Sequence, residues 1–341
     1  MPQNKLVPML LAGAALFLVS GAVAADPAPT AYLRAQRLVA VQGTRHLNLY
    51  CIGNGSPTVL FDSGLADSMA VWRLVQPIVA KATRACAYDR AGYGFSDPPL
   101  IASDAKSAVA DIQRLITAAP ITTPIVYVGH SIAGLYGVLL AATHPGDVAA
   151  EVLVDPSFAN QFFATTVSLS PKQRAKFFAS MEGSVAHMKK CAGIKDPLPK
   201  DCLGGDSQTG PRDKELVLLE RQRVSRPSYI LANASEMESF IPDHGHKSPS
   251  QKEVEAAQPA FGDKPLLILT HSKADPDSHI SSSQNAAREQ AWNEGHNRLA
   301  ALSNRGSNKI VPNSTHYIQI DQPQAVIDAV FQAVSEARRR R

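Results

Sequence analysis

A serine with small neighbours lies between two apolar segments of the sequence. Ser131 follows Gly129 by two positions and precedes Ile132, Ala133 and Gly134. Small residues are needed where a strand turns sharply into a helix, because the central residue takes a positive φ and crowds both elements. Such a turn exposes the hydroxyl at the helix N-terminus, where the backbone N–H of Ile132 can stabilise an oxyanion. The spacing therefore predicts that Ser131 is a nucleophile.

Three segments resemble the α/β-hydrolase superfamily. The turn around Ser131 resembles its Gly-x-Ser-x-Gly nucleophile elbow, with Ala133 at the position of the last glycine. Residues 62–65 resemble its oxyanion loop, and this resemblance makes the backbone N–H of Leu65 the second oxyanion donor. Residues 89–96 resemble its Asp-x-x-Gly-x-Gly-x-Ser loop, which gives Asp89 and Arg90 the role of scaffold residues.

The resemblance extends over about residues 45–155 and 263–335. It implies the α/β-hydrolase fold, a mostly parallel doubly wound sheet, and a catalytic triad in the chain order serine, acid, histidine. Dehalogenases and epoxide hydrolases of this superfamily need an aspartate at the elbow. The serine at that position therefore favours acyl transfer through a covalent intermediate.

A serine hydroxyl is a weak nucleophile and needs a base. Of the 10 histidines, His316 follows the expected strand at residues 309–311 and a turn at residues 312–315. The superfamily places its catalytic histidine on the corresponding loop. His130 lies inside the elbow, where we expect it to pack. The other histidines, His271 and His279 among them, fit no zinc spacing, so we expect no metal and no cofactor.

Two aspartates compete for the role of the triad acid, which holds the histidine ring and stabilises the imidazolium. Asp155 directly follows the expected strand at residues 151–154, and Asp275, with Asp277 beside it, follows the strand at residues 265–270. The second position is the usual one in the superfamily. The loop at residues 271–283 is long and polar, however, and for this reason we prefer Asp155 while both aspartates remain open.

Short apolar runs alternate with helical patterns along most of the chain. Strands are expected at residues 46–52, 58–61, 85–88, 125–128, 151–154, 265–270 and 309–311, and helices at residues 105–118, 132–143 and 323–336. This alternation predicts a parallel sheet covered on both faces. Residues 156–262 interrupt it with a more polar stretch that has helical patterns at residues 171–190 and 213–238. We interpret this stretch as a mainly helical cap inserted between two late strands.

The N-terminus has the features of a secretory signal peptide. Lys5 precedes an apolar run at residues 6–19, and small residues follow up to Ala24 and Ala25. The predicted organisation is therefore a signal peptide at residues 1–25, a core at 26–155, the cap at 156–262 and the rest of the core at 263–341. An uncleaved membrane anchor is the alternative for the first segment. An exported, periplasmic or secreted protein can form disulfides. We expect Cys191 to pair with Cys202, and leave the pairing of Cys51 with Cys86 open.

Composition limits the remaining classes of function. The net charge is only +4 over 341 residues, and arginines at the C-terminus contribute much of it, so no broad basic face for nucleic acid is expected. The body of the chain has no apolar stretch of membrane-spanning length. The expected function is the hydrolysis of a small-molecule carboxylic ester. Alternatives are an amidase or iminopeptidase, for which Glu236 and Glu238 are the suggestive acidic pair, and a non-catalytic binding protein. The sequence predicts neither the acyl chain nor the oligomeric state.

Overall fold

A computed structural model describes residues 30–194, 198–202, 214–242, 246–274 and 276–339. The predicted signal peptide at residues 1–25 and the alternative acid Asp275 lie outside the described residues. Among the described residues, no helix is both long enough and apolar enough to cross a membrane.

Eight strands form one sheet in the order β1-β2-β4-β3-β5-β6-β7-β8. Strands β1 and β2 and strands β2 and β4 pair antiparallel, and all other neighbours pair parallel. The strands are β1 (Arg37–Gln42), β2 (Arg45–Ile52), β3 (Val59–Asp62), β4 (Ala85–Tyr88), β5 (Ile125–His130), β6 (Val148–Val154), β7 (Leu266–His271) and β8 (Gly306–Val311). The predicted mostly parallel sheet is confirmed.

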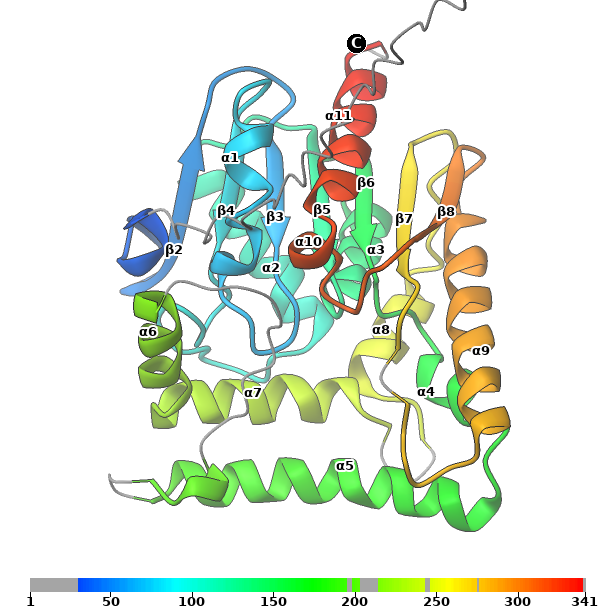
Figure 1. Cartoon of the computed structure of the whole chain (residues 1–341). Coiled ribbons are helices and arrows are strands. Elements are labelled where there is room, and N and C mark those ends of the chain that lie inside the picture. The colour runs from blue at the N-terminus through cyan, green and yellow to red at the C-terminus, as the bar shows by residue number, and fades with distance from the viewer. Residues whose placement is uncertain (1–29, 195–197, 203–213, 243–245, 275, 340–341) are drawn as a thin grey trace, which may run out of the picture.

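Helices cover both faces of this sheet (Figure 1). Strand β5 is buried along its whole length, and its alternate side chains belong to the two cores. Val126 and Val128 pack in the core on one face, whereas Ile125 and Tyr127 pack in the core on the other. The first core includes residues of α1 (Gln76–Val79), α10 (Ile318–Asp321) and α11 (Pro323–Arg339), and the second residues of α2 (Ala105–Ala118), α3 (Ala133–Thr143) and α9 (Ser282–Ala300).

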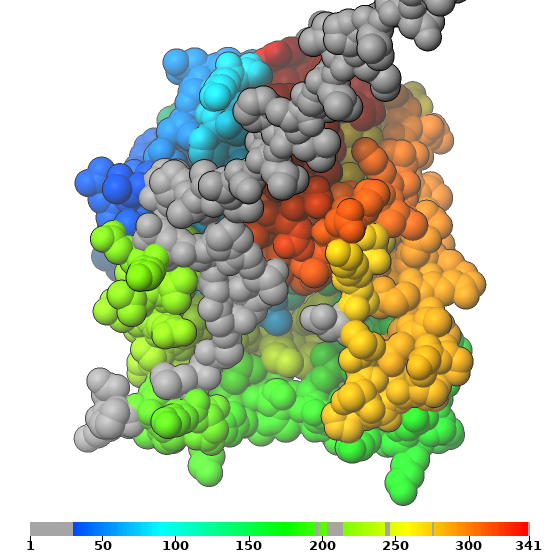
Figure 2. All heavy atoms as spheres, viewed as in Figure 1, coloured from blue at the N-terminus to red at the C-terminus, as the bar shows by residue number. Residues whose placement is uncertain are grey.

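The described residues between β6 and β7 are mainly helical. They form α4 (Gln161–Thr166), α5 (Pro171–Ala192), α6 (Lys214–Val224), α7 (Pro227–Phe240) and α8 (Pro249–Ala256). Helices α5 and α7 lie side by side across one end of the sheet (Figure 1). The space-filling view shows a hollow between this helical layer and the core (Figure 2). The limits of the predicted cap, 156 and 262, stay a prediction.

Some elements differ from those expected. The helical pattern at residues 213–238 is two helices, α6 and α7, because Pro227 has no backbone N–H to continue a helix and instead begins α7. Strand β1 was not expected because Val39 is its single buried residue, so its hydrophobic pattern is weak. Helix α9 was not expected because most of its residues are polar and its buried side chains lie near its C-terminal end.

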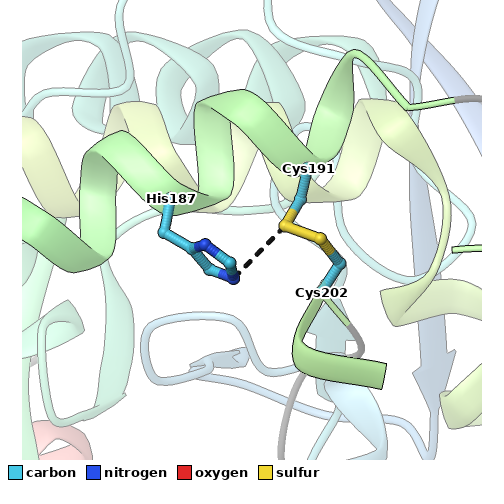
Figure 3. A group of neighbouring side chains, drawn as sticks. All are labelled: His187, Cys191 and Cys202. Atoms are coloured by element: carbon cyan, nitrogen blue, oxygen red, sulfur yellow. Dashed lines mark hydrogen bonds between the residues drawn. A yellow bond between two sulfur atoms is a disulfide. The ribbon is translucent and has the colours of Figure 1, made fainter. Parts of the chain in front are cut away.

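The four cysteines form two disulfides. Cys51 and Cys86 face each other on the paired strands β2 and β4. Cys191, at the end of α5, pairs with Cys202, as expected, and this disulfide closes the segment that follows the helix. His187 lies one turn before Cys191, with Nε2 3.4 Å from the Cys191 sulfur (Figure 3).

Candidate active site

Ser131 lies at a strained turn between β5 and α3. Its φ is +55°, in the left-handed region that an L-residue adopts only when its surroundings enforce it. Its N–H donates to the carbonyl of Val154, and its carbonyl accepts from the N–H of Ser157, both at the end of β6. Gly134 permits this packing, because a Cβ at that position would lie 2.4 Å from the Cβ of Pro156. Ala133, where the elbow pattern has glycine, is fully buried in the core.

The structure brings Ser131, His316 and Asp155 together. The Nε2 of His316 lies 2.9 Å from the hydroxyl of Ser131, and its Nδ1 lies 2.6 Å from the carboxylate of Asp155. Because the carboxylate accepts from Nδ1, Nε2 is free to accept the serine proton. The three residues come from the ends of β5 and β6 and from the loop after β8. The hydrogen bonds thus run from a hydroxyl to an imidazole to a carboxylate, an arrangement that can activate a serine as a nucleophile.

Asp155 is fully buried at the end of β6, with a φ of +44°. Its Oδ1 accepts from the backbone N–H of His271 and from the indole N–H of Trp292, at 3.2 and 3.0 Å. Its Oδ2 accepts from the imidazole Nδ1 of both His271 and His316. Burial alone would raise the pKa of this carboxyl, but the two imidazoles outweigh burial and hold the pKa well below its usual range. Asp155 is therefore an anion.

His130 packs inside the elbow, as expected, and supports His316. It is 1% exposed, and its Nε2 donates to the backbone carbonyl of His316 at 2.9 Å. Burial lowers the pKa of His130, so the ring is neutral. A Cβ at Gly64 would lie 2.7 Å from its Nδ1, so the predicted oxyanion loop packs directly against this ring.

The two predicted oxyanion donors, Leu65 and Ile132, are close in sequence to the two residues of this contact: Leu65 follows Gly64, and Ile132 comes two positions after His130. Ile132 directly follows Ser131 at the N-terminus of α3. The backbone N–H groups of Leu65 and Ile132 donate to no other described residue. Both amides are available to a substrate oxygen, and their role stays a prediction.

A buried network of charged residues and tyrosines binds the predicted oxyanion loop. The guanidinium of Arg90 donates to Asp62 and Glu236 and to the backbone carbonyls of Ser63 and Gly64. The tyrosines Tyr88 and Tyr127 donate to Asp62, and Tyr93 and Tyr136 to Glu236. Because Glu236 belongs to α7, this network joins the helical layer to the core.

The same contacts correct the expectation for Glu236 and Glu238. Glu236 is 2% exposed, and both of its oxygens accept hydrogen bonds from Arg90 and from tyrosines. Glu238 is exposed and binds the ammonium of Lys189. Because the carboxylate of Glu236 is buried and fully bonded, the two glutamates do not form the acidic pair that an iminopeptidase would need.

The predicted scaffold residue Asp89 accepts hydrogen bonds from the side chain of Asn48 and from the backbone N–H groups of Met69 and Phe95. It is buried and joins strand β2, the short helix that begins at Met69 and the loop that contains Phe95. Arg90, the other predicted scaffold residue, has the contacts described above.

Two groups of side chains in the described part of the chain have potential metal-ligand atoms close together. In one, His187 approaches Cys191 and Cys202, whose sulfurs are joined in the disulfide. In the other, the ligand atoms of Asp155, His271 and His316 lie within 4.8 Å of one another. Those atoms are joined by hydrogen bonds, which occupy the positions that a metal would need.

A sequence profile described as the alpha/beta hydrolase family matches residues 59–329. The chain belongs to this family. Among its relatives, the uncharacterized protein YqjL of Bacillus subtilis (strain 168) is 22% identical over 279 residues, which are 82% of this hydrolase and 84% of YqjL.

Solved structures show the same fold. A crystal structure of DBJA (the mutant delta) matches with a TM-score of 0.67 at 20% identity, over 89% of this hydrolase and 98% of DBJA. A thermophilic esterase from Thermogutta terrifontis matches with a TM-score of 0.59 at 17% identity, over 89% of this hydrolase and 99% of the esterase. At these identities the likeness establishes the α/β-hydrolase fold.

Three residues around Asp155 were not expected from the sequence. His271 was considered only as a metal ligand, and Glu289 and Trp292 lie on α9, which was not expected as a helix. All three contact either the carboxylate of Asp155 or the imidazole of His271.

Proposed function

We propose that this member of the alpha/beta hydrolase family is a serine hydrolase that cleaves a carboxylic ester by a Ser131–His316–Asp155 mechanism. The observation that carries the proposal is the continuous hydrogen-bonded series from the hydroxyl of Ser131 through His316 to the buried anion of Asp155. A serine in this arrangement becomes nucleophilic at neutral pH, because the base accepts its proton as the oxygen attacks.

In the first half of the reaction, the Ser131 oxygen attacks the ester carbonyl carbon, and its proton moves to Nε2 of His316. The negative oxygen of the tetrahedral intermediate accepts hydrogen bonds from the N–H groups of Ile132 and Leu65. The carbon–oxygen bond to the alcohol then breaks, and His316 returns the proton to the departing alkoxide. Asp155 stabilises the imidazolium during both proton transfers. The products are a free alcohol and an acyl group on Ser131.

In the second half, water attacks the acyl carbon while His316 accepts one of its protons. The bond to the Ser131 oxygen breaks, the proton returns to this oxygen, and the carboxylic acid leaves. The chain needs no cofactor for these steps. The proposed compartment is an exported, oxidising one, which the pairing of all four cysteines in disulfides supports.

The test compares wild-type protein with Ser131→Ala on a chain-length series of p-nitrophenyl esters and with a fluorophosphonate probe. We expect the wild type to react with the probe and to hydrolyse at least one ester, and Ser131→Ala to lose both reactions with an unchanged circular dichroism spectrum. Ser184→Ala, an exposed serine on α5, is the matched control and keeps both. Wild-type protein that neither reacts with the probe nor hydrolyses any ester supports a non-catalytic binding protein instead. Labelling that survives in Ser131→Ala contradicts the assignment.

A further inference from the structure

Asp155, the triad acid of the proposed mechanism, binds a second imidazole in addition to that of His316. His271, the last residue of β7, places its Nδ1 2.7 Å from Oδ2 of Asp155, the same oxygen that binds His316. Its Nε2 lies 2.9 Å from the carboxylate of Glu289 on α9. The hydrogen-bonded series thus continues beyond Asp155, through His271, to Glu289 near the surface. The ester-hydrolysis mechanism derived above uses neither His271 nor Glu289.

His271 also fixes the orientation of the Asp155 carboxylate. Its backbone N–H and the indole of Trp292 bind Oδ1, which leaves Oδ2 directed at the two imidazoles. The His271 side chain is 9% exposed, and the Asp155 side chain is fully buried. A fully buried anion takes its orientation from its donors, and here two of those donors belong to His271.

Both nitrogens of His271 face carboxylates, so the ring can satisfy both only as an imidazolium, with a proton on each nitrogen. Burial would lower its pKa, but the hydrogen bonds to Asp155 and Glu289 outweigh burial and raise the pKa of His271 to about 10. The other titratable neighbours are His316 and His296. Burial lowers the pKa of His296 to about 4, so this ring is neutral, and its Nε2 donates to the backbone carbonyl of Pro156.

We propose that His271 is a positioning residue of the catalytic site. As a permanent imidazolium, it orients the carboxylate of Asp155 and, together with His316, binds the negative charge of that carboxylate. The inference rests on the proposed function, because it assigns His271 a role through Asp155. A second cation on the same carboxylate oxygen weakens the attraction between Asp155 and a protonated His316. Without the charge of His271, Asp155 would attract a protonated His316 more strongly.

The charge and the geometry of His271 can be separated by substitution. His271→Gln keeps an N–H donor for Asp155 and removes the positive charge. For this variant we expect the acid limb of the kcat/KM profile to move up by roughly one pH unit, while kcat on the plateau falls less than about tenfold. His271→Phe removes the donor as well, and kcat falls by roughly a hundredfold, because Asp155 loses its orientation. Glu294→Gln, a substitution at an exposed position of α9, the helix that also carries Glu289, leaves the profile unchanged.

Histidine NMR on the Ser131→Ala protein reads the charge of His271 without turnover. We expect the His271 ring to remain protonated from pH 5 to 8, and its midpoint to fall by at least about one unit in Glu289→Gln, which loses one of the two carboxylates. A His271 ring that titrates between pH 5 and 8, or a His271→Gln profile that superimposes on that of the wild type, overturns the inference. If His271→Gln does not fold, the titrations of wild type and Glu289→Gln decide.

Failure of the proposed function has a different signature. It appears either as a wild type that hydrolyses no ester or as ester turnover that persists in Ser131→Ala. If Ser131→Ala is inactive while the acid limb does not move in His271→Gln, the triad stands and the role of His271 alone is rejected.

Discussion

Glu151 lies in β6, four residues before Asp155, with its carboxyl group in the core between the sheet and α3. It is fully buried, and neither of its oxygens has a hydrogen-bond partner among the described residues. A Cβ at Gly137 of α3 would lie 3.0 Å from its Oε2, so the carboxyl group packs against the helix that follows Ser131. Burial raises the pKa of Glu151 from 4.5 to about 8, and the attraction of Lys264 offsets only part of this shift.

The sign of the resulting pH dependence follows from proton binding. Between pH 4.5 and 8 the folded protein keeps the proton on Glu151 and the unfolded chain loses it. The folded state binds more protons in this range, so stability falls as the pH rises. Each unit of pH lowers the free energy of unfolding by about 1.4 kcal/mol. Glu151 alone therefore lowers it by on the order of 4 kcal/mol between pH 5 and pH 8. Glu151→Gln has the same shape and cannot ionise, so the variant does not carry this cost.

Urea unfolding of wild type and Glu151→Gln at pH 5, 6, 7 and 8 measures the difference. We expect Glu151→Gln to gain stability relative to wild type steadily with pH, by on the order of 3 to 4 kcal/mol over the range. Glu238→Gln, at an exposed glutamate, is the control, and its difference from wild type changes by less than about 1 kcal/mol. A flat difference for Glu151→Gln refutes the reasoning, because Glu151 would then titrate in the folded protein as it does in the unfolded chain.

Asp155→Asn is expected to lower kcat by on the order of 10⁴ in ester hydrolysis, because an amide favours the wrong tautomer of His316. Asp275→Asn is expected to leave kcat nearly unchanged. If the two variants give the opposite results, Asp275 is the acid. Glu236→Gln leaves part of the buried charge of Arg90 unpaired, and we expect a loss of about 3 kcal/mol in urea unfolding together with a lower kcat. A stability unchanged within about 0.5 kcal/mol contradicts that role. Reduction of the disulfide of Cys202 is expected to expose α5 to limited proteolysis before the sheet, since the short loop it closes contributes about 3 kcal/mol. Simultaneous cleavage of both regions rejects a local effect.

The sheet was predictable because its strands are short apolar runs and its turns contain glycine and proline. The same pattern led to the candidates Ser131, which directly follows β5, and His316, which lies on the loop after β8. The surroundings of Asp155 were not predictable in this way. Its partners His271 and Trp292 come from β7 and α9, and α9 has too few apolar residues to predict a helix. No local pattern indicates which side chains of two distant segments meet at one carboxylate.

Glu236 illustrates the same limit from the other side. The sequence marks it as an acidic residue of the helical insertion, and an acid there is compatible with binding a substrate amine. Its actual partner, Arg90, is 146 positions away in the chain. The pairing depends on how α7 crosses the end of the sheet, and that arrangement follows from the packing of the whole insertion rather than from the spacing of residues within it.

The position of the proposed acid, Asp155, gives a physical reason for the histidine that ends β7. Ser131 and Asp155 lie at the ends of the neighbouring strands β5 and β6, and both have a positive φ. Backbone hydrogen bonds hold each turn against the next strand, from Ser131 to Val154 and from Asp155 to Leu269. With the carboxylate supplied by β6, a second aspartate at the end of β7 would repel it. The proposed imidazolium of His271 at that position stabilises the anion instead, through the same carboxylate oxygen that binds His316.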